Sequence, residues 1–276
     1  MKDLPTLLRN FLNQYDEEER MEMRSRFYRL LEDKYDLKHL DILSGLKSLS
    51  ANDLISFEKD LKRLSSGEVL QYIIGWQNFC GMQIKVNKAV LVPRPETEEL
   101  VDIAFREAKA IDKAIDLGTG SGCIALALKN RFKKVYALEK SQEALELAQE
   151  NTRNLNRSIE FIWDDMLNPI EEWPGDLDLI VSNPPYVKQG EARAMEAAVK
   201  YGEPQMALFV EDDDPLLFYR AIKEYALKAL NSNGVLIVEI NQYLGEETKS
   251  LFAEAFENTR LLQDQFGNDR FVVAKK

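Results

Sequence analysis

From about residue 97 to the end of the chain, short apolar segments typical of buried strands alternate with amphipathic segments typical of helices. This alternation predicts an α/β fold, in which helices cover both faces of an open and mostly parallel sheet. The strands are expected at Ala114–Leu117, Lys134–Leu138, Ile159–Ile162, Leu177–Val181 and Val235–Ile240, with an antiparallel edge at 261–265 and 271–273. The helices are expected from about Glu98 and at Cys123–Asn130, Gln142–Asn154 and Pro215–Leu230.

The first 66 residues contain no convincing strand, and their apolar residues recur at helical spacing. This pattern predicts a small all-helical domain, whose last helix has Ser50 at its N-terminus. Residues 67–96 change to short segments, Gln71–Ile74 and Met82–Val86, which are interpreted as strands of a β-hairpin connector. We therefore expect a helical domain at 1–66, the connector at 67–96 and the α/β domain at 97–276.

The charge balance limits the partners of the chain. It carries 36 Lys and Arg against 47 Asp and Glu, a net charge of −11, so a broad basic face for nucleic acid is not expected. Cys80 and Cys123 fit no disulfide or zinc spacing, and a lone His39, expected to be an ordinary helix residue, cannot form a multi-histidine metal site. No apolar run approaches the ~18 residues of a membrane span. We expect a cytoplasmic monomer that binds no metal, no membrane and no nucleic acid directly.

A glycine-rich segment stands where the first strand of the α/β domain should pass into a helix. Its sequence is Asp116-Leu117-Gly118-Thr119-Gly120-Ser121-Gly122. Glycines let a backbone turn sharply beside a ligand, and ligands of open α/β sheets lie at the carboxyl ends of the strands. Glu139 ends the next strand, where an acidic side chain can accept hydrogen bonds from both hydroxyls of a ribose. A dinucleotide loop would need glycine or alanine where Cys123 stands, and the form here resembles the S-adenosylmethionine loop of class I methyltransferases.

A second motif, Asn183-Pro184-Pro185-Tyr186, follows the apolar strand at 177–181 and is expected at the same edge of the sheet. The two prolines restrict the backbone, so a carbonyl group and the Asn183 side chain are held out rigidly. Such acceptors suit a planar substrate that carries an amine, because they can bind both N–H groups and turn the nitrogen lone pair toward a methyl donor. Tyr186 is expected to stack on the planar group.

The tetrapeptide resembles the Asn/Asp-Pro-Pro-Tyr/Phe signature of methyltransferases that act on planar nitrogen, which is adenine in DNA or glutamine in protein. The connector favours the second class, because Leu70–Gly75, Phe79–Gly81 and Val90–Glu98 are similar to the segment characteristic of the HemK family of protein-glutamine methyltransferases. The likeness continues through residues 116–127, 137–145, 183–187, 203–204, 207–208 and 234–239.

This resemblance implies a class I, Rossmann-like methyltransferase that uses S-adenosylmethionine to methylate the glutamine of the Gly-Gly-Gln motif in class I peptide chain release factors. Residues 1–66 would recognise the protein substrate. The methionine and ribose parts of the cofactor would be held by Asp116, Gly118, Thr119, Gly120, Ser121, Gly122 and Glu139, and the adenine would be flanked by Asp165 and Met166. Asn183 would serve both the methyl-donor pocket and the target amide, and Pro184, Pro185 and Tyr186 would complete the substrate grip.

Two other functions stay open on the residues alone. An adenine-specific nucleic-acid N6-methyltransferase would use the same tetrapeptide on a flipped base, although the net charge and the connector argue against it. A non-catalytic adenosine-binding module would require vestigial motifs. The chain also departs from the family at 209–214, where an acidic run replaces a glycine-rich turn; it could hold a cation, but a solvated loop with Asp214 capping a helix at Pro215 is the favoured interpretation.

Overall fold

The computed structural model describes residues 4–44, 47–194 and 202–276. These residues fall into two compact units: one contains the described residues up to Trp76 together with Gly202, and the other contains residues 77–194 and 203–276. No helix within the described ranges is long and apolar enough to cross a membrane.

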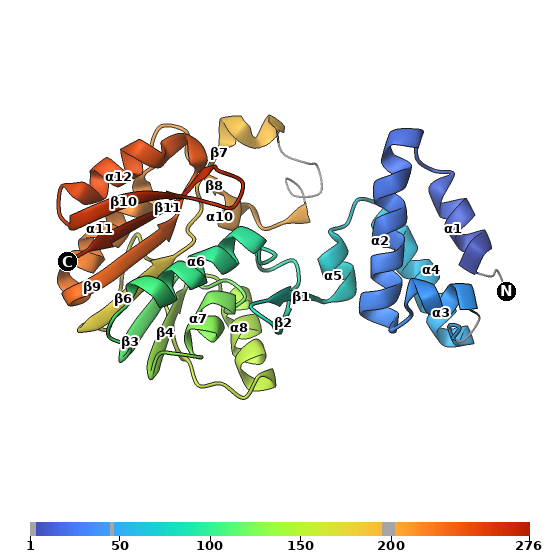
Figure 1. The fold of residues 1–276 in the computed structure, drawn as a ribbon, viewed down its shortest axis with the longest axis horizontal. Helices are drawn as coiled ribbons and strands as arrows, with labels where there is room; N and C mark the ends of the chain where they lie inside the picture. Colours follow the sequence, from blue (N-terminus) through green and yellow to red (C-terminus); the bar gives the residue numbers. More distant parts are fainter. Residues whose placement is uncertain (1–3, 45–46, 195–201) are drawn as a thin grey trace. The chain divides into compact units, whose positions relative to one another are not determined.

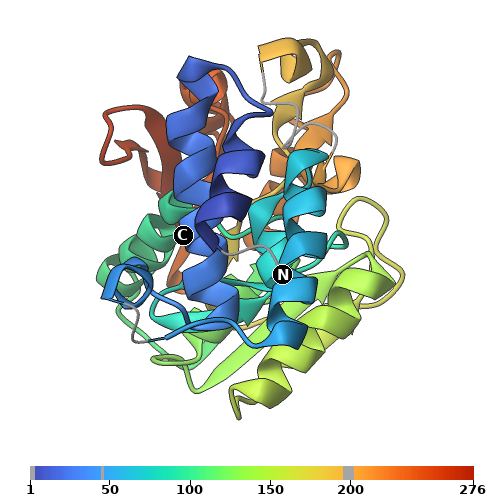
Figure 2. The same ribbon diagram turned by 90° about the vertical axis from the view of Figure 1, so that its right-hand side faces the viewer.

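The first unit is helical, as predicted. Helices α1, α2 and α4 lie against one another (Figures 1 and 2). Their contacts bury the rings of Phe27 and Phe57, whose centroids are 5.1 Å apart in an edge-to-face arrangement. Ser50 caps α4 by accepting the N–H of Asp53, and His39 stands at the exposed start of α3, as expected. The helices are α1 (Leu4–Leu12), α2 (Glu17–Tyr35), α3 (His39–Ser44), α4 (Ala51–Ser65) and α5 (Leu70–Ile74).

The predicted strand at Gln71–Ile74 is wrong, because these residues form helix α5. Ile73 and Ile74 are buried in the core of the helical unit, and Lys34 Nζ donates to the Ile73 carbonyl at 2.7 Å. Gly75 ends the helix with a φ of 97°, a left-handed conformation that favours glycine. Packing against neighbouring helices therefore outweighs the β propensity of this segment.

A hairpin follows helix α5, as the sequence predicted for the connector. Strands β1 (Trp76–Phe79) and β2 (Met82–Lys85) pair with each other. Their two-residue turn is formed by Cys80 and Gly81, both with positive φ values of 48° and 74°, which is the geometry that tight hairpins favour.

The second unit is built on a seven-stranded sheet in the order β10-β11-β9-β6-β3-β4-β5 (Figure 1). The strands β5, β4, β3, β6 and β9 are mutually parallel, whereas β11 runs antiparallel to both of its neighbours, as expected for the edge. The fold class predicted from the alternation of strands and helices is thus confirmed. The strands are β3 (Lys113–Leu117), β4 (Lys134–Glu139), β5 (Glu160–Trp163), β6 (Leu177–Ser182), β9 (Leu230–Glu239), β10 (Glu257–Gln263) and β11 (Asp269–Lys275).

Helices pack on both faces of this sheet because alternate strand residues are apolar on both sides. On one face, Ile115 and Leu117 of β3 share a buried cluster with Tyr219 of α11 and Phe252 of α12. Helices α6, α7 and α8 contact strands of the sheet as well. The helices are α6 (Pro95–Glu107), α7 (Cys123–Leu128), α8 (Gln142–Asn154), α10 (Gln205–Leu208), α11 (Leu217–Ala229) and α12 (Gly245–Ala253), with 3₁₀ turns η1 (Gln189–Ala194) and η2 (Gln242–Leu244).

The acidic run after Leu208 differs from the predicted loop in two ways. Phe209–Val210 is strand β8, which pairs in parallel with β7 (Val187–Lys188). Asp214 is not the N-cap of α11, because the helix begins at Leu217 and the Asp214 carboxylate instead forms an ion pair with Arg220. The Asp212 carboxylate accepts the N–H of Gly190 at 3.0 Å. Among the described residues, no group of three His, Cys, Asp or Glu side chains could hold a metal ion.

Candidate active site

The predicted motifs meet at the carboxyl edge of the sheet. Leu117 at the end of β3 lies opposite Leu138 of β4 and Ser182 of β6. The strand order reverses between β3 and β6, and such a switch point is where ligands bind in open α/β sheets. The loops after these three strands carry the glycine-rich segment, Glu139 and the tetrapeptide, so residues from three separate parts of the sequence face one place.

The glycine-rich loop joins β3 to α7 in a conformation that requires its glycines. Gly118, Gly120 and Gly122 have positive φ values of 76°, 56° and 81°. The N–H groups of Gly118 and Thr119 both donate to the Leu138 carbonyl at 2.9 Å, which ties the loop to β4. A Cβ atom at Gly118 would lie 3.2 Å from Met166 Cε, so a side chain there would crowd the space beside the loop.

Asp116 lies behind the loop and is completely buried. Its Oδ2 atom accepts hydrogen bonds from Thr119 Oγ1 at 2.5 Å and from the N–H of Ala125 at 3.2 Å. Its Oδ1 atom has no hydrogen-bond partner among the described residues. Burial raises the pKa of the carboxyl to about 7, against the effect of the two hydrogen bonds and together with the nearby charge of Glu139. An unpartnered buried acceptor of this kind fits a cationic amine of a ligand.

Glu139 ends β4 and is 8% exposed. Its Oε2 atom accepts the N–H of Gly120 at 2.9 Å, and its Oε1 atom accepts the N–H of Ser141 at 2.8 Å. Burial raises the pKa of this carboxyl, while the backbone N–H donors oppose that rise. The carboxylate is held at both oxygens beside the glycine-rich loop and lines a pocket at this edge of the sheet.

Asp165 and Met166 follow β5. The Asp165 carboxylate forms an ion pair of 2.8 Å with Lys140 Nζ and accepts the N–H of Leu167 at 2.9 Å. Burial alone would raise the pKa of Asp165, but these contacts outweigh burial and lower the pKa. Met166 packs against the core beneath the glycine-rich loop. The structure therefore brings both residues to the pocket that the loop borders.

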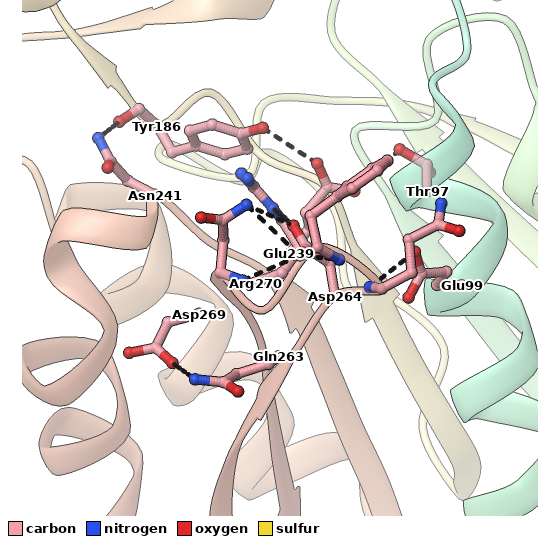
Figure 3. Close-up of polar contacts among 12 residues, drawn as sticks. Thr97, Glu99, Tyr186, Glu239, Asn241, Gln263, Asp264, Asp269 and Arg270 are labelled. Atoms are coloured by element: carbon pink, nitrogen blue, oxygen red, sulfur yellow. Dashed lines mark hydrogen bonds and ion pairs between the residues drawn. The ribbon is translucent and has the colours of Figure 1, made fainter.

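The tetrapeptide leaves the end of β6, where Ser182 Oγ donates to the Leu117 carbonyl at 2.7 Å. Asn183 is partly buried, and its Nδ2 atom donates to Thr97 Oγ1 at 3.2 Å. The hydroxyl of Tyr186 donates to Glu239 Oε1 at 3.0 Å, and the Tyr186 carbonyl accepts from Asn241 Nδ2 at 3.0 Å (Figure 3). Burial raises the pKa of Tyr186 strongly, and Glu239 adds to this effect, so the hydroxyl keeps its proton.

One pocket at this edge gathers most of the predicted residues. Its lining includes the predicted Gly118, Thr119, Gly120, Ser121, Glu139, Asp165, Met166, Asn183 and Pro185. Asp116, Gly122, Pro184 and Tyr186 lie outside the lining, although each is adjacent in sequence or hydrogen-bonded to a residue near it. The ring of Tyr186 packs against the core cluster of the sheet rather than into the pocket.

Other residues of the pocket received no role from the sequence. Thr97 lines it from α6, and Arg94 precedes that helix. Arg94 Nη2 forms an ion pair of 2.5 Å with the buried carboxylate of Glu203, whose second oxygen accepts the N–H of Val92 at 3.2 Å. Burial raises the pKa of Glu203, and Arg94 opposes the rise. One sequence feature could have pointed to these residues: they lie in the segments 90–98 and 203–204, which are similar to the family.

The fold and this pocket define a methyltransferase of the Rossmann-like class. The family model described as "Methyltransferase small domain" matches residues 99–203. A solved methyltransferase from Pyrococcus furiosus shares the fold with a TM-score of 0.54 at 19% identity, covering 82% of this chain and 99% of its own. A 16S rRNA methyltransferase from Thermus thermophilus has a TM-score of 0.53 at 18% identity, covering 73% of this chain and 49% of its own.

Curated relatives identify the family. The release factor glutamine methyltransferase of Flavobacterium psychrophilum is 43% identical over 260 residues, which is 91% of each chain. The enzyme of the same name from Bacteroides thetaiotaomicron is 40% identical over 241 residues, covering 86% of this chain and 87% of the relative. This chain belongs to the release factor glutamine methyltransferase family.

Proposed function

We propose that this protein transfers a methyl group from S-adenosylmethionine to the side-chain amide nitrogen of the glutamine in the Gly-Gly-Gln motif of class I peptide chain release factors. The observation that carries the proposal is the placement of Asn183 and Pro185 in one pocket with the glycine-rich loop and Glu139, in a chain of this family. We further propose that it acts as a cytoplasmic monomer and does not bind nucleic acid directly, in keeping with its net charge of −11.

The cofactor would occupy the part of the pocket beside the glycine-rich loop. Bound S-adenosylmethionine supplies an electrophilic methyl group on a sulfonium. The Oδ1 atom of Asp116, for which the described part of the chain offers no hydrogen-bond partner, suits the cofactor's amino group, and the Glu139 carboxylate suits the ribose hydroxyls. Asp165 and Met166 would flank the adenine. Gly118, Thr119, Gly120, Ser121 and Gly122 would let the loop pass close to the methionine part.

The substrate amide would lie against the tetrapeptide. An amide nitrogen is a weak nucleophile because its lone pair is delocalised into the carbonyl group. The Asn183 side-chain oxygen and the Pro184 carbonyl would each accept one N–H, which directs the nitrogen lone pair toward the methyl carbon. The new nitrogen–carbon bond would form as the carbon–sulfur bond of the sulfonium breaks, and the methylated nitrogen would then lose a proton to solvent. Pro185 would complete the wall of the pocket, and Tyr186 would anchor the segment through Glu239.

Incubation with radiolabelled cofactor and two separate substrates tests the proposed function. Label on the glutamine of the release factor, identified by mass spectrometry of the Gly-Gly-Gln peptide, is the expected result. Label on adenine in DNA would instead establish the alternative function. Binding of the cofactor with label on neither substrate would leave only an adenosine-binding role and would contradict the proposal.

Replacing Glu139 with glutamine is expected to weaken cofactor binding by ~1 to 3 kcal/mol, because two charge-assisted hydrogen bonds become neutral. The glutamine amide group would also present N–H donors to the N–H of Gly120 or Ser141, which now face carboxylate oxygens. Titration calorimetry measures the effect. The matched control is Glu143→Gln, which makes the same substitution at an exposed residue in the first turn of α8. Unchanged affinity in a folded Glu139→Gln protein would remove Glu139 from the ribose role.

The affinity for cofactor is expected to rise with pH through about 7. The pKa of Asp116 is about 7, so the carboxyl is neutral below that pH and anionic above it, and only the anion attracts the cofactor's ammonium group. Well below the pKa, affinity should fall by up to roughly tenfold for each pH unit. Calorimetry between about pH 5.5 and pH 8 measures the dependence. Asp116→Asn should bind weakly without this rise; an equal rise in that variant would assign the titration to another group.

A further inference from the structure

One buried carboxylate holds both ends of the tetrapeptide. Glu239 ends β9 and is 2% exposed. Its Oε2 atom accepts the hydroxyl of Thr97 at 2.8 Å, and its Oε1 atom accepts the hydroxyl of Tyr186 at 3.0 Å (Figure 3). Thr97 in turn accepts from Asn183 Nδ2 at 3.2 Å. The first and last residues of the motif are therefore linked through Glu239.

The direction of these hydrogen bonds follows from the carboxylate, because each of its two oxygens accepts a hydroxyl group. Burial raises the pKa of Glu239, and its two hydroxyl donors and the positive charge of Arg270 oppose that rise. A carboxylate can only accept, and Thr97 has a single hydroxyl proton, so that proton points to Glu239. The oxygen of Thr97 is then left with lone pairs alone toward Asn183. Only the NH₂ end of the Asn183 amide can face it, which turns the amide oxygen away from Thr97.

The orientation of this amide matters for the reaction. If the amide were reversed, its NH₂ group would face the N–H of the substrate amide, and two donors would be opposed. A neutral group in place of Glu239 would permit that reversal, because the Thr97 proton could then point to Asn183 Oδ1. Glu239 and Thr97 thus stabilise one of the two nearly isosteric orientations of the Asn183 amide.

We infer that Glu239 is a positioning residue that, through Thr97, fixes the Asn183 side-chain amide with its oxygen toward the target nitrogen. Glu239 touches neither substrate nor cofactor in this scheme, and Glu239 does not line the pocket. The inference rests on the proposed function for the identity of the substrate. The arrangement of Glu239, Thr97 and Asn183 does not depend on that identity, because an adenine amine would need the same acceptor.

Four variants of the full-length protein test the relay: Glu239→Gln, Thr97→Val, Thr97→Ser and the double variant of the first two. Glu239→Gln and Thr97→Val should each lower kcat at least tenfold, with KM for the release factor and Kd for the cofactor within twofold of wild type. Thr97→Ser restores a hydroxyl and should recover the rate. The double variant should be no slower than the slower single variant, because both changes interrupt the same chain of hydrogen bonds from Glu239 through Thr97 to Asn183. Glu160→Gln, an exposed carboxylate on β5, is the matched control.

Two results would overturn the inference. Wild-type kcat in a folded Glu239→Gln protein would show that the carboxylate is not needed, and multiplied losses in the double variant would show that Glu239 acts independently of Thr97.

A wild-type protein that labels adenine rather than the release factor contradicts the proposed function, and the same rate ratios on adenine then test the relay. For a protein without turnover, NMR of the Asn183 side-chain amide decides: its hydrogen exchange should accelerate at least tenfold in Thr97→Val, and unchanged exchange would refute the relay.

Discussion

Asn183→Ala is expected to lower the single-turnover rate of methyl transfer about 100-fold to 1,000-fold at saturating cofactor, by analogy with loss of one preorganised polar contact to a reacting group. The variant removes one of the two acceptors that would direct the lone pair of the target nitrogen. The contact of Asn183 with Thr97 is a single hydrogen bond of 3.2 Å, so the fold should tolerate its loss. Rapid-quench measurements give the rate, and the melting temperature gives the control. Wild-type turnover by this variant would refute the proposed mechanism.

Asn183→Asp gives a sharper test, and the structure changes its expected outcome. If the side-chain oxygen alone mattered, an aspartate, which keeps that acceptor, should retain more activity than alanine, whereas equal loss in both variants would point to the amide donor. In the structure, however, the Thr97 proton is already donated to Glu239, so the introduced carboxylate would face a lone pair and lie near a second carboxylate. We therefore expect Asn183→Asp to lose at least as much activity as Asn183→Ala. A clearly faster aspartate variant would show that the Thr97 contact does not constrain the side chain at this position.

The architecture of the second unit was predictable because its strands are nearly continuous apolar segments separated by helical patterns. Every residue of β6, for example, is buried, and an apolar segment of this kind is typical of a central strand. The motifs after β3, β4 and β6 then had to meet, because parallel strands end at one edge. The position of Asn183 near the glycine-rich loop was therefore predictable from the order of the strands.

Two parts of the molecule depended on contacts that the sequence does not display. Helix α5 has the β-branched residues Ile73 and Ile74, yet their burial among the other helices decides its conformation. Thr97 and Glu239 are separated by 142 positions, and the hydrogen bond between them exists only because α6 and β9 contact each other. Both residues stand within segments similar to the family, but the similarity of a segment does not identify the partner of a side chain.

A chain that begins at Gly75 should keep the affinity for cofactor within about twofold but lose most of its activity on intact release factor. The pocket residues within the described ranges all lie at position 89 or beyond, and the cut leaves strand β1 complete. It removes α1 to α5, which share the core of the helical unit. Specific recognition of a protein commonly buries about 800 Å² on each partner, far more than a single glutamine loop can supply.

The expected loss is about 100-fold or more in kcat/KM for the intact factor, which corresponds to ~3 kcal/mol of docking energy. A short peptide that contains Gly-Gly-Gln is the control substrate, because it engages only the pocket; full-length and truncated proteins should methylate it at similar rates. Calorimetry with cofactor verifies that the truncated protein is folded. If the truncated protein methylates the intact factor at the full-length rate, residues 1–66 do not recognise the substrate. If it binds cofactor but fails on the peptide as well, the helical unit instead supports the geometry of the pocket.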